Sequence, residues 1–341
     1  MRTKKLPSKN ASIEDVARLA GVSITTVSRV INKLPSVKDK NRAKVANAVK
    51  ELKFQPSVFA QRLATGKSNV IALVVPRYEG MFYSFYVLEL IRGIGTLCEA
   101  LKLDLLLHLA DSNASLNLKG AGGIIFADII NNRQQLNDAL TFGIPSIVIN
   151  NYVDDVEVDC IYVDNLGGAV QAVDYLVSLG HRKIAHITGD IVTQAAAERL
   201  KGFTKSLAKN KIPVNEKYII KTDYSRGQAR QAAELLVKME NPPTAVFVAS
   251  DSMALEVMAV ARELGKSVPQ DLSIVGFDDN PSGLYGPVSL TTVRQPLVKM
   301  AQESVKRLNF LMSAKKKPKN EKILLPTELV VRESCRSIVS A

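Results

Sequence analysis

The sequence predicts an α/β protein in which an N-terminal helix-turn-helix headpiece precedes a body of two doubly wound parallel-sheet units. Two patterns lead to this fold class. Apolar residues recur at helical spacing through residues 12–52, whereas residues 68–341 alternate short β-branched apolar runs with helical stretches. With 341 residues the chain is also too long for one ordinary core, so we expect two or three domains.

Residues 12–31 are expected to form two helices that meet at a tight turn. Ser12 and Asp15 stand three positions apart, which is the spacing of a capping box. Gly21 tolerates the left-handed conformation that the turn needs, and Ser23 supplies a side-chain oxygen to cap the second helix. The inner stripe of that second helix is expected at Ile24, Val27, Val30 and Ile31.

The second helix also carries a polar, cationic face. Thr25, Arg29 and Asn32 stand at i, i+4 and i+7 on a different side from the inner stripe. A helix-turn-helix places its second helix in the major groove, where an arginine can donate two parallel hydrogen bonds to guanine. We therefore expect Thr25 and Arg29 to read bases. The alternative is a helical hairpin whose polar face meets only water.

A third helix is expected from about Ser36 to Leu52, followed by a break at Gln55-Pro56. Beyond the break, residues 57–64 (SVFAQRLA) have helical composition but are too few to form a stable isolated helix in water. We expect this segment to be helical only when another molecule or segment holds it.

These segments resemble the LacI/GalR family of bacterial transcriptional regulators. The likeness rests on EDVARLAGVSITTVSRVIN, KELKFQPSVFAQRLATGKS and LLPTELVVRESC. It implies that residues 57–64 are a hinge helix that folds on DNA and pairs with its two-fold mate, with Leu63 as a wedge in the minor groove. An apolar wedge can unstack a base step and kink the duplex, although Leu63 could instead pack hinge against hinge. The expected DNA-contacting residues are Ile24, Thr25, Thr26, Arg29, Asn32, Ser57, Ala60 and Leu63.

Nearly all of the net charge lies in the first 67 residues. They hold 15 lysines and arginines against 4 acidic residues, and the remainder holds 30 against 29, so the +12 divides into +11 and +1. A basic block beside a neutral body is typical of phosphate contacts and predicts DNA binding that weakens steeply with salt. A membrane surface is the competing partner, but the apolar residues leave no broad hydrophobic face for it.

We expect a cytoplasmic protein with no cofactor and no metal. Cys98, Cys160 and Cys335 lie far apart, and none has a metal-like spacing to a histidine. The N-terminal residues lack the apolar run of a signal peptide, and the longest apolar runs are too short to cross a membrane. The glycine-rich phosphate loops and the nucleophile elbow are absent, so we do not expect an enzyme.

The body reads as two series of buried strands separated by helical stretches. The first series is VIALVVP, LDLLLHLA, AGGIIFA, IPSIVINN and CIYVDN, and the second is KIAHITGD, KYIIKTDY, TAVFVASD and LSIVGFDD. Ligands bind at the carboxyl ends of such strands, so the residues that follow each strand are candidates for a cleft.

The polar residues at these positions suggest a ligand with several hydroxyl groups. Asp278 and Arg199 can face each other and hold vicinal hydroxyls or a small polar ring through charge-assisted hydrogen bonds, with Tyr224 as an aromatic wall. Helix-cap roles are the alternative, above all for Asp251 and Asn165. The expected ligand-binding residues are Asn150, Arg199, Tyr224, Ser250 and Asp278.

The resemblance extends to the body, which in this family is similar to periplasmic sugar-binding proteins. It implies two subdomains joined by three crossovers, near Asp164, Thr292 and Pro326, with the effector in the cleft between them. The boundaries that we expect are 1–56 for the headpiece, 57–67 for the hinge helix and linker, about 68–164 with 293–325 for the N-terminal subdomain, and about 165–292 with 326–341 for the C-terminal subdomain.

Three segments depart from the family pattern. Alanines occupy 195–197, where polar contacts often precede the position of Arg199, so some specificity contacts are absent. The loop at 78–86 is longer and more aromatic than usual. Residues 111–123 leave little room for a crossover helix between two strands, so we expect that helix to be truncated.

Taken with the resemblance, these features lead us to expect a homodimeric repressor that binds a palindromic double-stranded operator. A small-molecule effector, with a sugar first and a purine-like corepressor second, is expected to control it from the cleft. The alternative is an effectorless body that a protein partner regulates. No leucine heptad follows Cys335, so we expect no tetramerisation tail.

Overall fold

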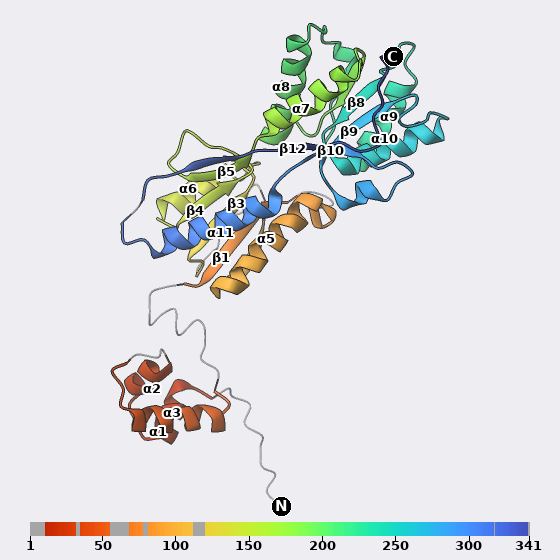
Figure 1. The fold of residues 1–341 in the computed structure, drawn as a ribbon. Helices are drawn as coiled ribbons and strands as arrows, with labels where there is room; N and C mark the ends of the chain where they lie inside the picture. Colours follow the sequence, from red (N-terminus) through yellow and green to blue (C-terminus); the bar gives the residue numbers. More distant parts are fainter. Residues whose placement is uncertain are drawn as a thin grey trace, which may run out of the picture. The chain divides into compact units, whose positions relative to one another are not determined.

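A computed structural model describes residues 11–31, 35–54, 68–77, 81–111, 120–316 and 318–339. The chain divides into two units, Met1–Ser68 and Asn69–Ala341, each with its own core. The first unit is helical and the second contains two β-sheets, as Figure 1 shows. None of the helices described is long and apolar enough to cross a lipid bilayer.

The headpiece unit consists of α1 (Ile13–Ala20), α2 (Ile24–Ile31) and α3 (Asp39–Glu51). The capping box is confirmed, since the Ser12 and Asp15 side chains each bond the other residue's backbone N–H. Gly21 has a φ of 63°, and the backbone N–H of Thr26 donates to Ser23 Oγ at 3.2 Å, so both parts of the turn form as expected.

Two details of the headpiece differ from expectation. Ile24 was assigned to the inner stripe, but its side chain is 47% exposed, because the first turn of α2 projects beyond the small core. Only Val27 of that stripe is fully buried, with Val30 and Ile31 half-buried around it. The third helix begins at Asp39 and not near Ser36. Lys38, the residue before it, has an extended backbone, so the helical conformation starts only after Lys38.

Lobe 1 of the body is a six-stranded parallel sheet in the order β11-β5-β4-β3-β1-β2. Alternate residues of its strands face opposite layers: Ile71 and Leu73 pack on α5 and α11, whereas Ala72 and Val74 pack on the α6 side. Its elements are β1 (Val70–Pro76), η1 (Met81–Tyr83), α5 (Phe85–Leu101), β2 (Asp104–Ala110), β3 (Gly123–Ala127), α6 (Arg133–Thr141), β4 (Ser146–Ile149), β5 (Asp159–Val163), α11 (Leu297–Ser313) and β11 (Lys322–Leu325).

Lobe 2 is a second six-stranded sheet, in the order β12-β10-β9-β8-β6-β7, in which only β12 runs antiparallel to its neighbour. Helices α7 and α8 cover one face, and α9 and α10 cover the other. Its elements are α7 (Asn165–Ser178), β6 (Ile184–Ile187), α8 (Gln194–Lys209), η2 (Glu216–Tyr218), β7 (Ile219–Ile220), α9 (Arg226–Val237), β8 (Ala245–Val248), α10 (Asp251–Glu263), β9 (Ser273–Asp278), η3 (Pro281–Leu284), β10 (Thr291–Arg294) and β12 (Glu328–Val330).

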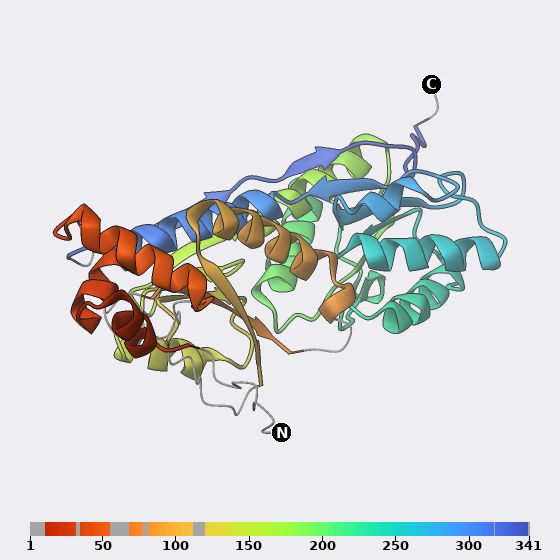
Figure 2. The same ribbon diagram turned by 90° about the horizontal axis from the view of Figure 1, so that it is seen from below.

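The two sheets confirm the expected α/β fold class, with a helical headpiece and a doubly wound, two-lobed body. The chain crosses between the lobes three times: after β5, between β10 and α11, and between β11 and β12. Figure 2 shows the last two of these connections running from one lobe to the other.

Two strands differ from what their runs suggested. Strand β2 lies at the edge of its sheet, so Leu106 and Leu107 are 43% and 36% exposed, although the apolar run LDLLLHLA was expected to be buried. The strand expected in KYIIKTDY is reduced to β7, because the preceding residues form the short helix η2. The truncated helix expected within residues 111–123 falls largely outside the described residues.

Candidate DNA-contacting face and effector cleft

Helix α2 exposes side chains that were expected to meet bases. Thr25 and Arg29 are exposed, and so is Ile24. Thr26 differs, because its hydroxyl lies 2.9 Å from Ser23 Oγ and helps to hold the start of the helix. Four expected DNA contacts lie outside the described residues: Asn32, Ser57, Ala60 and Leu63.

The cleft candidates stand at the ends of the body's strands, and several have unusual backbone conformations. Asn150 directly follows β4 with a φ of 64°, Tyr224 has a φ of 68°, and Asp278 at the end of β9 has a φ of 135°. Asp128, directly after β3, shares this feature with a φ of 69°. Non-glycine residues seldom adopt positive φ, and such strained positions cluster at binding sites.

Arg199 lies on α8 and is held from three directions. Its Nε donates to Asn165 Oδ1 at 2.9 Å, and a terminal nitrogen donates to the backbone oxygen of Ala249 at 2.5 Å. The guanidinium also stacks on Phe277, with its carbon 3.8 Å from the ring centroid. The side chain is 4% exposed, so the cleft contains one rigidly placed cation at this point. Asn165 therefore serves to position Arg199.

Asp278 and Asp128 each place a carboxylate at the carboxyl end of a strand, one in each lobe. The Nε2 of Gln295 donates to Asp278 Oδ1 at 2.6 Å, and the Nδ2 of Asn150 donates to Asp128 Oδ1 at 2.8 Å. Desolvation raises the pKa of both carboxyls, to about 6 for Asp128, while the positive charge of Arg199 acts in the opposite direction on each. The guanidinium therefore lies within electrostatic reach of both carboxylates.

Tyr224 forms an aromatic wall that depends on a glycine. A Cβ atom on Gly189 would stand 2.0 Å from Cζ of the tyrosine ring, so only glycine leaves room for the ring. Desolvation raises the pKa of the Tyr224 hydroxyl, while the charge of Arg199 and a hydrogen bond from Thr193 lower it. The tyrosine is therefore neutral at physiological pH, with its ring packed on the backbone at Gly189.

Ser250 and Asp251 make structural hydrogen bonds at the start of α10. Ser250 caps the helix, with its Oγ accepting from the backbone N–H of Met253 at 3.4 Å. Both oxygens of Asp251 are used: the Thr292 hydroxyl donates to Oδ1 at 2.6 Å, and the Asn280 N–H donates to Oδ2 at 2.7 Å. A ligand role for Ser250 stays a prediction.

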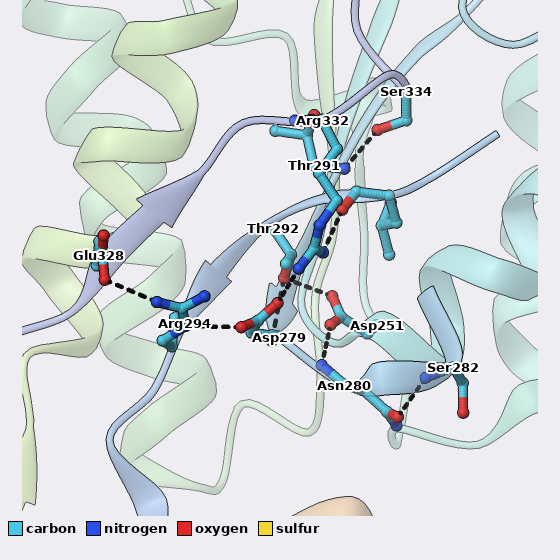
Figure 3. A network of polar contacts seen from close by, with 11 residues as sticks. Asp251, Asp279, Asn280, Ser282, Thr291, Thr292, Arg294, Glu328, Arg332 and Ser334 are labelled. Carbon is cyan, nitrogen blue, oxygen red and sulfur yellow. Dashed lines mark hydrogen bonds and ion pairs between the residues drawn. The ribbon is translucent and has the colours of Figure 1, made fainter. Parts of the chain in front are cut away.

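An ion-pair network joins the crossover strands next to the cleft (Figure 3). Asp279 accepts from Arg294 Nε at 2.7 Å and also pairs with Arg332. Arg294 extends the network to Glu328 on β12 at 3.0 Å. Asp279 directly follows Asp278 in the chain. The backbone that carries the Asp278 carboxylate is therefore linked by ion pairs to the strands that connect the lobes.

The lobes also meet directly beside a groove of about 250 Å³. The side-chain amide of Gln194, at the start of α8, accepts from the backbone N–H of Tyr152 at 2.8 Å and donates to the backbone oxygen of Tyr152 at 3.3 Å. Residues of both lobes line the groove, including Arg133 and Val192. The Gln194–Tyr152 contact is thus one point at which the lobes are joined.

Comparisons with known proteins match both units. The family model of bacterial regulatory proteins, lacI family, matches residues 12–57, and the model of the periplasmic binding protein-like domain matches residues 173–335. The HTH-type transcriptional regulator DegA of Bacillus subtilis is 36% identical over 334 residues, covering 95% of this chain and 97% of that protein. The chain belongs to the LacI family of bacterial regulatory proteins.

Solved structures of LacI-family proteins agree in fold over nearly the whole chain. The Lac repressor dimer bound to operator and the anti-inducer ONPF is 28% identical, with a TM-score of 0.85 and coverage of 96% of this chain and 100% of that one. The transcriptional regulator CelR in complex with cellobiose is 28% identical, with a TM-score of 0.70 and coverage of 95% and 99%. These LacI-family relatives are transcriptional regulators and not enzymes.

Two cleft residues were missed by reasoning from the sequence. Asp128 follows the strand run GIIFA just as Asn150 follows the next run, so the same positional rule would have found it. Gln295 could not be found this way, because it lies on a crossover and reaches Asp278 only through the topology of LacI-family bodies.

Proposed function

We propose that this protein is a homodimeric transcriptional repressor that binds a palindromic operator and responds to a small sugar bound between its lobes. The observation that carries the proposal is the exposed Thr25–Arg29 face of α2 on a helix-turn-helix unit, in a chain whose body has a polar cleft. The Lac repressor relative binds operator as a dimer, which supports a two-fold arrangement of headpieces. Such a regulator works in the cytoplasm.

Within this proposal, Arg29 and Thr25 read bases, and the basic residues around them contact phosphates. Asn32, Ser57, Ala60 and Leu63 complete the expected DNA surface, with Leu63 as the minor-groove wedge. Residues 57–64 gain helical order on bent DNA, and the relative position of the lobes favours or opposes that order. The cleft ligand acts by changing that position.

A sugar is favoured as the effector because the cleft combines an aromatic wall with fixed polar groups. Tyr224, Arg199 and Asp278 provide a ring surface, a cation and a carboxylate, with Asn150 from the other lobe. The CelR relative is solved with cellobiose, which supports the same class of ligand here.

A second candidate is control by a protein partner without any effector. The observation that favours it is that Ala195 and Ala196 are buried and offer no polar group to a ligand, while Gln194 already joins the lobes. A purine-like corepressor is the remaining alternative. Calorimetry with panels of sugars and nucleobases separates the three: heat from a sugar, heat from a nucleobase, or no heat together with intact operator binding.

The test of DNA reading is Arg29→Ala in the full chain, with Lys44→Ala on α3 as a control that removes the same charge from an exposed position. The operator is first selected from random DNA with the wild-type protein. Fluorescence anisotropy should show that Arg29→Ala loses specific binding by about 1–3 kcal/mol while it keeps most nonspecific affinity. Equal loss of specific and nonspecific affinity would show that Arg29 contacts only phosphate.

A further inference from the structure

Two of the described residues that bond the carboxyl groups of Asp128 and Asp278 carry a buried oxygen atom with no donor. Among the residues that the structure describes, Asn150 Oδ1 and Gln295 Oε1 are buried and have no hydrogen-bond partner. A buried oxygen without a donor is destabilising, so natural proteins seldom leave one unless a ligand or water supplies the bond. The two atoms belong to different parts of the cleft, one after β4 and one on the crossover that follows β10.

The orientation of both amides is fixed by their neighbours. The Nδ2 of Asn150 donates to Asp128 Oδ1, and the Nε2 of Gln295 donates to Asp278 Oδ1. Rotating either amide by 180° would place its oxygen against a carboxylate oxygen, which is repulsive. The carboxylates therefore hold both amide oxygens as acceptors, and each lobe presents a carboxylate beside an amide oxygen.

Part of the Arg199 guanidinium is already engaged by the protein. Arg199 donates to Asn165 and to the backbone of Ala249, and its face is covered by Phe277. Its charge acts on both Asp128 and Asp278, so one guanidinium is shared between two carboxyl groups. The pocket thus has an excess of acceptors and negative charge. An anionic ligand would add like charge to a desolvated site, which opposes its binding.

We propose that the cleft selects an uncharged sugar, tolerates its amino derivative and rejects carboxylated sugars, with Asp128 as a specificity-determining residue from lobe 1. Sugar hydroxyls donate to Asn150 Oδ1 and Gln295 Oε1 while they bridge the carboxylates of Asp128 and Asp278. This inference rests on the proposed sugar-responsive function and narrows the ligand class. It assigns a ligand contact to Asp128, which reasoning from the sequence had not considered.

The experiment is isothermal titration of the full-length protein with matched sets of sugars. Each set contains a neutral sugar, its uronic acid and its amino sugar, with glucose, glucuronate and glucosamine as one set and galactose, galacturonate and galactosamine as another. Ribose and cellobiose complete the panel. At pH 7.5 the neutral member of a set that binds should bind at least about tenfold more tightly than its uronate.

The variant Asp128→Asn tests the residue itself. The asparagine can still accept from Asn150 and meet the Tyr86 hydroxyl, so the fold is retained while the charge is removed. The ratio of neutral-sugar to uronate affinity should fall by about tenfold or more. The control Asp138→Asn removes the same charge from α6, where the Asp138 carboxylate accepts from the Gln134 amide, and should leave that ratio unchanged.

Three results overturn the inference: a uronate that binds as tightly as its neutral parent, an Asp128→Asn ratio equal to that of wild type, or no binding by any member of the panel. Operator binding is measured in parallel by anisotropy. If a uronate binds and changes operator affinity, the proposed function stands and the inference fails. If the operator is not bound specifically at all, the proposed function fails on its own.

Discussion

Replacing Gln194 by alanine should loosen the connection between the lobes. The wild-type amide makes two hydrogen bonds to the backbone of Tyr152, at 2.8 Å and 3.3 Å, and both lie at an exposed site. A neutral hydrogen bond contributes about 0.5–1.5 kcal/mol, and exposure favours the lower part of that range, so the pair contributes about 1–2 kcal/mol. The ratio of joined to separated lobes should therefore fall roughly 5- to 30-fold.

Two measurements on full-length Gln194→Ala check this prediction. Hydrogen exchange of the Tyr152 amide should speed up, because that N–H loses its acceptor. If the proposed coupling between the lobes and the hinge segments holds, the Kd for the selected operator should change by a factor of up to about 30. The control Gln134→Ala removes an amide that bonds Asp138 within α6 and should leave both quantities unchanged.

The reasoning is refuted if the Tyr152 amide becomes unprotected and the operator Kd stays within twofold of wild type. That result would show that the lobes can separate at this contact without any effect on DNA binding. The direction of the change in Kd also identifies which lobe arrangement favours DNA: weaker binding in Gln194→Ala assigns DNA binding to the joined form.

Three further changes test other parts of the account. Desolvation raises the pKa of Asp251 from 3.8 to about 7, so this carboxyl lowers the free energy of unfolding as pH rises between those values. The stability of Asp251→Asn relative to wild type should therefore be higher at pH 8 than at pH 4, measured by urea unfolding, and a pH-independent difference contradicts this. Val27→Ala creates a cavity in the headpiece core and should lower the free energy of unfolding of the headpiece by about 1–3 kcal/mol. The variant should lose operator binding at 37 °C and keep normal ligand binding in the cleft. Leu63→Ala should weaken operator binding and reduce bending in a phasing assay, and unchanged bending refutes the wedge.

The headpiece and the layers of the body could be predicted because their determinants are local. The capping box at Ser12, the left-handed Gly21 and the alternation of apolar runs with helices each act within a few residues, and the structure shows them as expected. The prediction that Ile24 faces the core was wrong, because the spacing of apolar residues identifies one face of a helix but not how far the small core extends along that face. Edge position likewise depends on strand order, so the exposure of β2 could not be inferred from its apolar run.

The grouping of polar residues near the strand ends could be predicted, since the ends of parallel strands gather at one edge of a sheet, and the residues that bind a ligand there stay a prediction. The partners of these residues were less accessible to sequence reasoning. Asp251 belongs to a network with Thr292 and Asn280, and Gln295 reaches Asp278 from a crossover, so each contact joins residues that are distant along the chain. Pairings of this kind depend on the order of strands in the sheet, which local patterns do not contain.

Anisotropy titration of the selected operator with the full-length protein, with and without a saturating amount of the sugar that binds best, tests the central claim most directly. The account predicts that the sugar changes the specific Kd by about 5- to 150-fold, while the affinity for random DNA changes little. Identical operator Kd values with and without the bound sugar would contradict control of DNA binding from the cleft.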